Sequence, residues 1–160
     1  MSDPISTGAA ARMLGTSRQH VVNLVNRGVL RRYGSGTHRR VRRADVEALL
    51  GSPLSRDARQ SLWLHRAVAG RVAADPEAAI ARACRNLELM ASAAGRRSPW
   101  LAHWEEVLAA GPERVLRVLT DADSPLAVEL RQNSPFAGLL SEAERRLLLE
   151  AFRRVDAGRA

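Results

Sequence analysis

The chain has 160 residues, enough for one sizeable hydrophobic core or two small ones, and apolar residues make up 46% of it. This proportion excludes a disordered chain, and the longest apolar runs are too short to cross a bilayer. The first residues lack the features of a secretory signal, and Cys84 is the single cysteine, which excludes an intrachain disulfide. We therefore expect a soluble protein of the cytoplasm that does not associate with membranes.

The charge of the chain is concentrated near its N-terminus. The formal net charge is +8, and every basic residue is an arginine. Residues 1–60 contain 11 arginines and 4 acidic residues, whereas residues 61–160 contain 14 arginines and 13 acidic residues. A strongly basic segment next to a segment of nearly zero net charge is typical of a nucleic-acid-binding domain attached to a second domain.

Residues 1–53 contain the signals of two short helices, a β-hairpin and a third helix. Ser6 is placed to cap a first helix, and the turn at 15–17 leads into a second helix that ends at Gly28. Two β-type runs, Val29 to Tyr33 and His38 to Arg43, surround a glycine-containing breaker and predict a hairpin. A helix over 44–50 follows. We expect residues 1–53 to form one domain.

This order of elements resembles the winged helix-turn-helix domain of phage excisionases and of MerR-type regulators. The segment that carries the resemblance is ISTGAAARMLGTSRQHVVNLVNRGVLRRYGSGTHRRVRRADVEALL, residues 5–50. The residues that fill the recurring positions of that family are Ser6, Ala10-Ala11, Leu14-Gly15, Ser17, Gly28, Leu30, Arg43 and Asp45-Val46-Glu47. The sequence departs from the family at Thr37-His38, where another basic residue is common. The resemblance implies that the chain binds double-stranded DNA.

A helix-turn-helix of this layout places the start of its second helix in the major groove and its wing along the phosphates. The polar residues at the start of the second helix are therefore predicted to read bases: Ser17, Arg18, Gln19, His20 and Asn23. For His20, a solvated surface position is an equal alternative. The wing residues are predicted to contact the DNA backbone: Arg31, Arg32, Thr37, His38, Arg39, Arg40, Arg42 and Arg43.

Residues 54–160 are predicted to form an all-helical domain of about six helices, so the fold class is mainly α. A long amphipathic helix is expected over 56–74, and helix-start signals follow at Asp75-Pro76, Ser98-Pro99, Gly111-Pro112 and Ser124-Pro125. A capping box at 141–144 precedes the last helix. Aromatic residues of this domain belong either to its core or to a surface for a protein partner: Trp63, Trp100, Trp104 and Phe136.

The sequence gives little support for catalysis. Its four histidines are scattered without metal-ligand spacing, and we find neither a phosphate-binding glycine loop nor a nucleophile motif. Cys84 falls in an apolar helical stripe, which favours a buried thiol over a nucleophile. We predict no catalytic residue, no metal site and no cofactor, and we expect the chain not to be an enzyme.

The leading hypothesis is a sequence-specific transcriptional regulator. Its two-part architecture is similar to that of antitoxins, which repress their own operon and bind a toxin. In this chain, residues 54–160 would be the part that binds the toxin. A homodimer is expected, because one small head covers only a few base pairs. Two alternatives remain: an excisionase-type recombination factor that bends DNA, and a MerR-like sensor of a small effector. In each case the protein would be found with the nucleoid in the cytoplasm.

Overall fold

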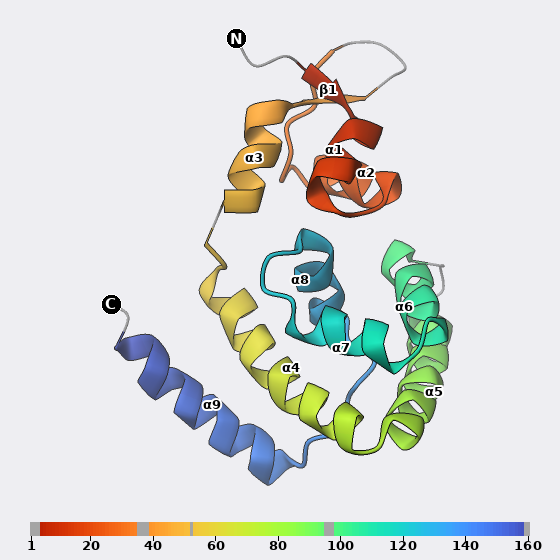
Figure 1. Cartoon of the computed structure of the whole chain (residues 1–160), viewed down its shortest axis with the longest axis vertical. Helices are drawn as coiled ribbons and strands as arrows, with labels where there is room; N and C mark the ends of the chain where they lie inside the picture. The colour runs from red at the N-terminus through yellow and green to blue at the C-terminus, as the bar shows by residue number, and fades with distance from the viewer. Residues whose placement is uncertain (1–3, 35–38, 52, 95–97, 159–160) are drawn as a thin grey trace. The chain divides into compact units, whose positions relative to one another are not determined.

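The computed structural model describes residues 4–34, 39–51, 53–94 and 98–158, and these residues divide into two compact units (Figure 1). The first unit is formed mainly by residues 1–53, and the second mainly by residues 54–122 and 127–160. Short strands and helices make up the first, and helices make up the second. The expected class, mainly α with a small N-terminal helix-turn-helix domain, is confirmed.

The first unit contains two short strands and three helices. In chain order these are β1 (Pro4–Ser6), α1 (Thr7–Leu14), α2 (Arg18–Asn26), β2 (Arg40–Arg42) and α3 (Arg43–Gly51). The strands are antiparallel, with Ile5 opposite Val41. Their inward side chains join the helices in a core of small and branched residues: Ala10, Ala11, Leu14, Val21, Leu24, Leu30, Val41 and Val46.

The wing differs from the predicted hairpin. Strand β2 pairs with β1 instead of with residues 29–33, and within the described residues of that segment the sole ladder contact is a bridge between Tyr33 and Arg40. The cause lies at the end of α2, where the N–H groups of Val29 and Leu30 both donate to the carbonyl of Leu24. Because these donors close the helix, they are not available to a strand ladder.

The second unit contains six helices in its described residues. They are α4 (Arg56–Ala74), α5 (Pro76–Ala94), α6 (Pro99–Ala109), α7 (Pro112–Thr120), α8 (Pro125–Gln132) and α9 (Glu142–Ala157), with the first two residues of α8 grouped with the first unit. Helix α4 is central, since it packs against α5, α7 and α9, while α6 packs against α5 and α7. None of the helices in the described chain is long and apolar enough to span a membrane.

Helix α9 lies along α4 and is held at both ends (Figure 1). Near its start, Glu144 pairs with Arg71, and near its end the Asp156 carboxylate accepts from Arg59 Nη2 at 2.7 Å. Between them, the indole N–H of Trp63 donates to the carbonyl of Leu148 at 3.0 Å. These contacts fix α9 antiparallel to α4.

Most of the aromatic residues considered for a partner surface lie in contacts within this unit. Trp104 is fully buried and donates to the carbonyl of Leu130 at 3.1 Å, and its ring meets the buried ring of Phe136 at a centroid distance of 5.6 Å. Trp63 is half-buried and packs on Phe152 of α9. The partner-surface interpretation is therefore corrected for Trp104 and Phe136, because packing has already covered them. It stays a prediction for Trp63 and Trp100, which are both half-buried.

Cys84 was expected to be buried and is exposed. The inward face of α5 is formed by Ala79, Ala83 and Leu87, and Cys84 lies one position after Ala83. Because neighbouring positions on a helix are 100° apart, this offset is enough to move the thiol from the core to the surface.

Candidate nucleic-acid interface

Three residues join α1 to α2 and set the position of the second helix. Gly15 adopts a left-handed conformation with φ 63°, which a residue with a Cβ adopts at a cost, and the N–H of Thr16 returns to the carbonyl of Ala11. Ser17 then caps α2, its hydroxyl accepting from the N–H of His20 at 3.1 Å. The turn thus ends one helix and begins the next with local hydrogen bonds.

Helix α2 has one face in the core and one face free. Val21 and Leu24 are buried against α1, whereas Arg18 and Gln19 are exposed and Asn23 is half-exposed. Arg18, Gln19 and Asn23 all fall on the first two turns of α2. The helix therefore offers polar side chains at its N-terminal end, where a helix in a major groove contacts base edges.

His20 is the exception among the predicted base-reading residues. Its side chain is 1% exposed, so it belongs to the core of this unit and does not reach a base in this conformation. The prediction for His20 is corrected, because its position next to Val21 places it on the face that meets α1. The sequence could not decide this, since a single polar residue beside an apolar stripe fits either side of the helix.

Arg18 and Gln19 each make a contact that fixes their side chains. The Nε of Arg18 donates to Oγ1 of the buried Thr7 at 3.1 Å, which leaves both Nη groups for a ligand. The Nε2 of Gln19 donates to Oδ1 of Asn23 at 3.2 Å. This pair then presents the Gln19 oxygen and the Asn23 amide nitrogen, an acceptor next to a donor, as adenine requires in the major groove.

The arginines of the wing are exposed without exception, from Arg31 and Arg32 through Arg39, Arg40, Arg42 and Arg43. Within the described chain, Arg31 and Arg39 make no hydrogen bond or ion pair. The predicted backbone contacts at Thr37 and His38 lie outside the described residues.

The wing arginines Arg40, Arg42 and Arg43 contact other residues of the unit. The guanidinium of Arg42 lies over the ring of Tyr33, 4.3 Å from its centroid. Arg40 donates to the carbonyl of Pro4 at 3.5 Å, and Arg43 forms an exposed pair with Glu47 at 3.9 Å. All three contacts are weak and open to solvent, so a phosphate can compete for these cations.

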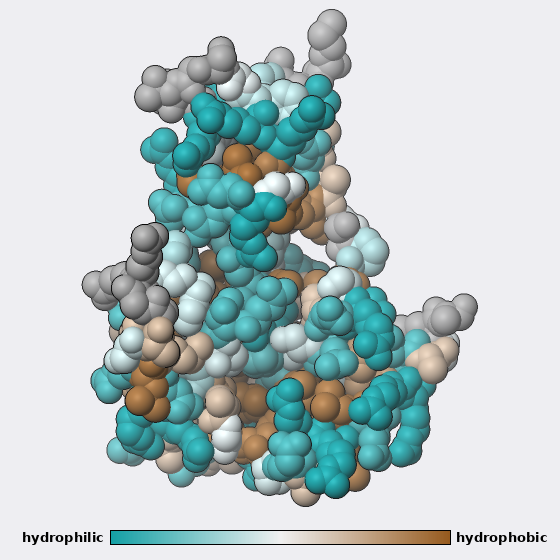
Figure 2. Space-filling view, turned by 180° about the vertical axis from the view of Figure 1, so that it is seen from behind, coloured by the Kyte–Doolittle hydropathy of each residue, from teal (hydrophilic) through white to brown (hydrophobic). Residues whose placement is uncertain are grey.

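Two further arginines add to this charge and were not predicted as contacts. Arg12 lies in the last turn of α1 and Arg27 at the end of α2, and both are exposed. Their signal in the sequence was their place at helix ends, which is also explained by the helix dipole. Figure 2 shows hydrophilic residues over much of the visible surface of this unit.

The comparison with family models decides what this arrangement is. Residues 5–52 match the model described as a helix-turn-helix domain. This part of the chain is a helix-turn-helix domain. The match agrees with the resemblance to excisionase-like segments found in the sequence. Comparison with curated proteins and comparison with solved structures each gave no significant match.

The helix-turn-helix domain indicates a DNA-binding regulator, and proteins of this DNA-binding family are typically not enzymes. The match ends at residue 52, so it describes the first unit and does not extend to the helical unit. Among the described residues, no group of three or more potential ligands is placed to hold a metal ion.

Proposed function

We propose that this protein is a sequence-specific regulator of transcription that reads DNA with the start of α2. The observation that carries the proposal is the polar end of α2, where Arg18, Gln19 and Asn23 are oriented by their own hydrogen bonds and stand clear of the core. Exposed arginines on the wing supply the attraction for phosphates that such a helix needs.

The first test is a gel-shift titration of the full chain on DNA from just upstream of its own gene, with a scrambled duplex as competitor. Specific binding supports an autoregulator. In the Arg18→Ala variant, affinity for the specific duplex should fall by about 1 to 3 kcal/mol, with a smaller loss on the scrambled duplex. Arg146→Ala on α9, also exposed, is the matched control. Equal losses on both duplexes would remove Arg18 from base reading.

The contribution of the wing is tested by its salt dependence. Arg40→Ala should weaken binding to both duplexes and reduce the slope of log K against log salt by about 0.9, the value for one lost phosphate contact. Arg43→Ala is the comparison, because its ion pair with Glu47 competes for the same cation. An unchanged slope for Arg40→Ala would exclude a phosphate contact there.

We further propose that the helical unit brings two copies together on the DNA, since paired half-sites are the usual source of specificity. The support is the outer side of α9, where Leu147 and Val155 are 67% and 48% exposed. Leu147→Gln should shift the protein from dimer to monomer in analytical ultracentrifugation. Leu89→Gln, at a comparably exposed position on α5, is the control and should have no effect.

An antitoxin is the narrower form of this proposal, in which a toxin binds the helical unit. It rests on the two-part architecture, with a small DNA-binding head before a helical body. Co-expression with the product of the adjacent gene tests it: relief of toxicity and co-purification would support an antitoxin. The alternative, an excisionase-type factor, predicts a strong bend in the bound DNA and an integrase gene nearby.

A further inference from the structure

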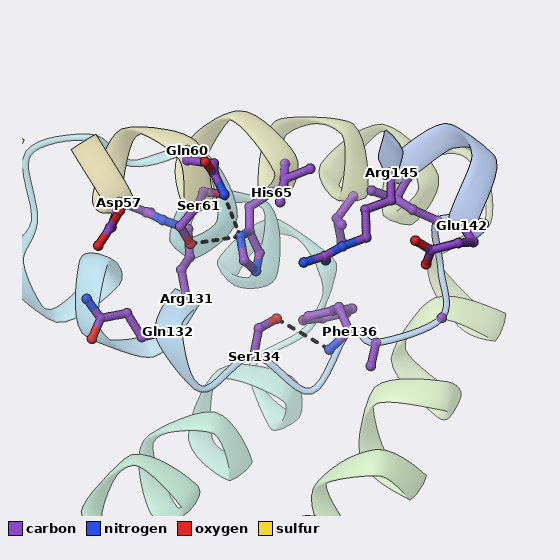
Figure 3. Close-up of a pocket in the computed structure, with 15 residues that line it drawn as sticks. Asp57, Gln60, Ser61, His65, Arg131, Gln132, Ser134, Phe136, Glu142 and Arg145 are labelled. Atoms are coloured by element: carbon purple, nitrogen blue, oxygen red, sulfur yellow. Dashed lines mark hydrogen bonds between the residues drawn. The ribbon is translucent and has the colours of Figure 1, made fainter. Parts of the chain in front are cut away.

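A pocket of about 750 Å³ opens within the helical unit between α4, α8, α9 and the segment that joins the last two (Figure 3). Part of its wall is apolar and comes from Leu64, Val68, Phe136 and Leu140. The buried Arg131 and the half-buried His65 contribute polar groups to the wall. A volume of this size falls within the range of small-molecule sites, which combine an apolar wall with a few polar groups.

The guanidinium of Arg131, on α8, uses one of its three nitrogen atoms in hydrogen bonds within the protein. Its side chain is almost entirely buried, at 2% exposure, and its Nη1 donates to the carbonyls of Val118 at 2.8 Å and Asp121 at 2.6 Å. These carbonyls lie at the C-terminal end of α7, which the guanidinium therefore caps. The Nε and Nη2 atoms are also buried and have no hydrogen-bond partner among the described residues.

The two unused atoms lie on the same edge of the guanidinium. Their N–H bonds are parallel, and this is the edge that binds both oxygens of a carboxylate. A buried charged donor without an acceptor costs free energy, so an acceptor that enters here recovers it. Figure 3 shows Arg131 extending from α8 toward α4 along the wall of the pocket.

The charge of the surroundings favours an anion at this edge. The pKa of Arg131 is lowered to about 10, mainly by burial; Asp121 opposes this shift and Arg66 adds to it. The side chain is therefore still a cation at neutral pH. Arg145 of α9 adds a second positive charge to the lining. The carboxylates of the lining, Asp57 and Glu142, are exposed.

His65 stays neutral beside these cations. Burial is the main reason that its pKa is lowered to about 4, and the nearby charges of Arg131 and Arg145 lower it too, against a hydrogen bond with the carbonyl of Ser61 that raises it. In that bond Nδ1 lies 2.7 Å from the carbonyl oxygen, which makes Nδ1 the donor. The other ring nitrogen is then an acceptor.

We propose that this pocket binds a small organic carboxylate, whose two oxygens accept from Nε and Nη2 of Arg131 while its apolar body packs on Leu64, Val68 and Phe136. Both donor atoms are covered, so binding requires side chains of the lining to move, and among these the exposed Gln132 and Arg145 change rotamer readily. The proposal concerns the helical unit alone and does not depend on DNA binding.

The experiment is a titration of the full chain with acetate, hexanoate and phenylacetate at up to 10 mM, followed by tryptophan fluorescence and by calorimetry. Trp104 reports on the pocket because its ring packs on Phe136, which lines it. We expect one bound hexanoate or phenylacetate per chain, weaker binding of acetate, and at least tenfold weaker binding of phenylacetamide, which lacks the charge. No binding of any carboxylate, or equal binding of acid and amide, would overturn the proposal.

Two arginine variants distinguish binding in the pocket from non-specific attraction of the ligand to positive charge. Arg145→Gln removes a pocket charge and should weaken phenylacetate binding several-fold, whereas Arg146→Gln changes the next residue, outside the lining, and should not. Equal effects of the two variants would count against the pocket.

Arg131→Lys keeps the positive charge but not the two parallel N–H donors. If circular dichroism shows that this variant is folded, it should bind phenylacetate at least tenfold more weakly than the wild type.

Because Arg131 also caps α7, its substitution can unfold the unit, and a second variant avoids this. Ala137 lines the pocket and is exposed, so Ala137→Phe fills the space without touching the guanidinium. It should abolish phenylacetate binding, and unchanged binding would place the ligand elsewhere. A blocked peptide, acetyl-Phe-Glu-amide, tests a protein source of the carboxylate: binding tenfold tighter than phenylacetate would overturn the small-molecule assignment.

Discussion

Lowering the pH should destabilise the helical unit through one side chain, His65. Its pKa is about 4 in the folded protein and 6.5 in an unfolded chain. Between these values the unfolded chain binds a proton that the folded protein does not, so stability falls as the pH is lowered. Each pH unit in this window removes about 1.4 kcal/mol, and the whole window removes up to about 3 kcal/mol, or about 2 kcal/mol after allowance for the partial exposure of the side chain.

The assay is urea unfolding followed by tryptophan fluorescence between pH 7 and pH 4.5. All three tryptophans, Trp63, Trp100 and Trp104, belong to the helical unit, so the signal reports on the part that contains His65. At pH 7 the free energy of unfolding of His65→Gln should be lower than that of the wild type, because the variant loses the bond to the Ser61 carbonyl. Between pH 7 and pH 4.5 it should then fall by about 2 kcal/mol less than the wild-type value does.

His103→Gln is the matched control, since it removes a different histidine of the same unit and keeps His65. Its free energy of unfolding should fall on acidification by nearly as much as that of the wild type. If His65→Gln lost as much stability as the wild type on acidification, a buried neutral His65 would be excluded and the reasoning about the charges in the pocket would be refuted.

Three further changes test the packing described above. Ser17→Ala removes the cap of α2 and should destabilise the helix-turn-helix domain by about 1 kcal/mol, measured as faster amide hydrogen exchange in α2; unaltered exchange would show that the cap is dispensable. Asp156→Asn breaks the pairing of α9 with Arg59 and should cost about 1 to 2 kcal/mol in urea unfolding, whereas Glu150→Gln, which breaks an exposed pair with Arg154, should cost less than about 0.5 kcal/mol. Phe136→Ala opens the core beside Trp104 and should cost about 3 kcal/mol with a change in fluorescence, and a loss under about 1 kcal/mol would contradict its burial.

The helix starts were predictable because their signals are local. Pro76, Pro99, Pro112 and Pro125 each occupy the first position of a helix, as the sequence indicated. The capping box at Ser141 forms with both of its hydrogen bonds. A cap involves residues three or four positions apart, so it acts in nearly the same way whatever the rest of the chain does. For the same reason the turn before α2 and the positions of Arg18 and Gln19 could be anticipated.

Burial could not be predicted in the same way, because it depends on residues far apart in the chain. His20 fits either side of α2 by its spacing, and only contact with α1 placed it inside. The wing strand had two possible partners, and the closure of α2 by the N–H groups of Val29 and Leu30 left it with β1.

The sequence by itself therefore determined which segments are helical, where they begin, and that the basic N-terminal part is a helix-turn-helix domain. The tertiary structure decided which polar residues face inward. Arg131 shows this most clearly: nothing in the sequence singles it out, yet it is buried at the end of α7, has two buried donor atoms without a partner and lines a pocket. Caps and turns are set by neighbours in sequence, whereas a pocket exists only where helices distant in sequence meet.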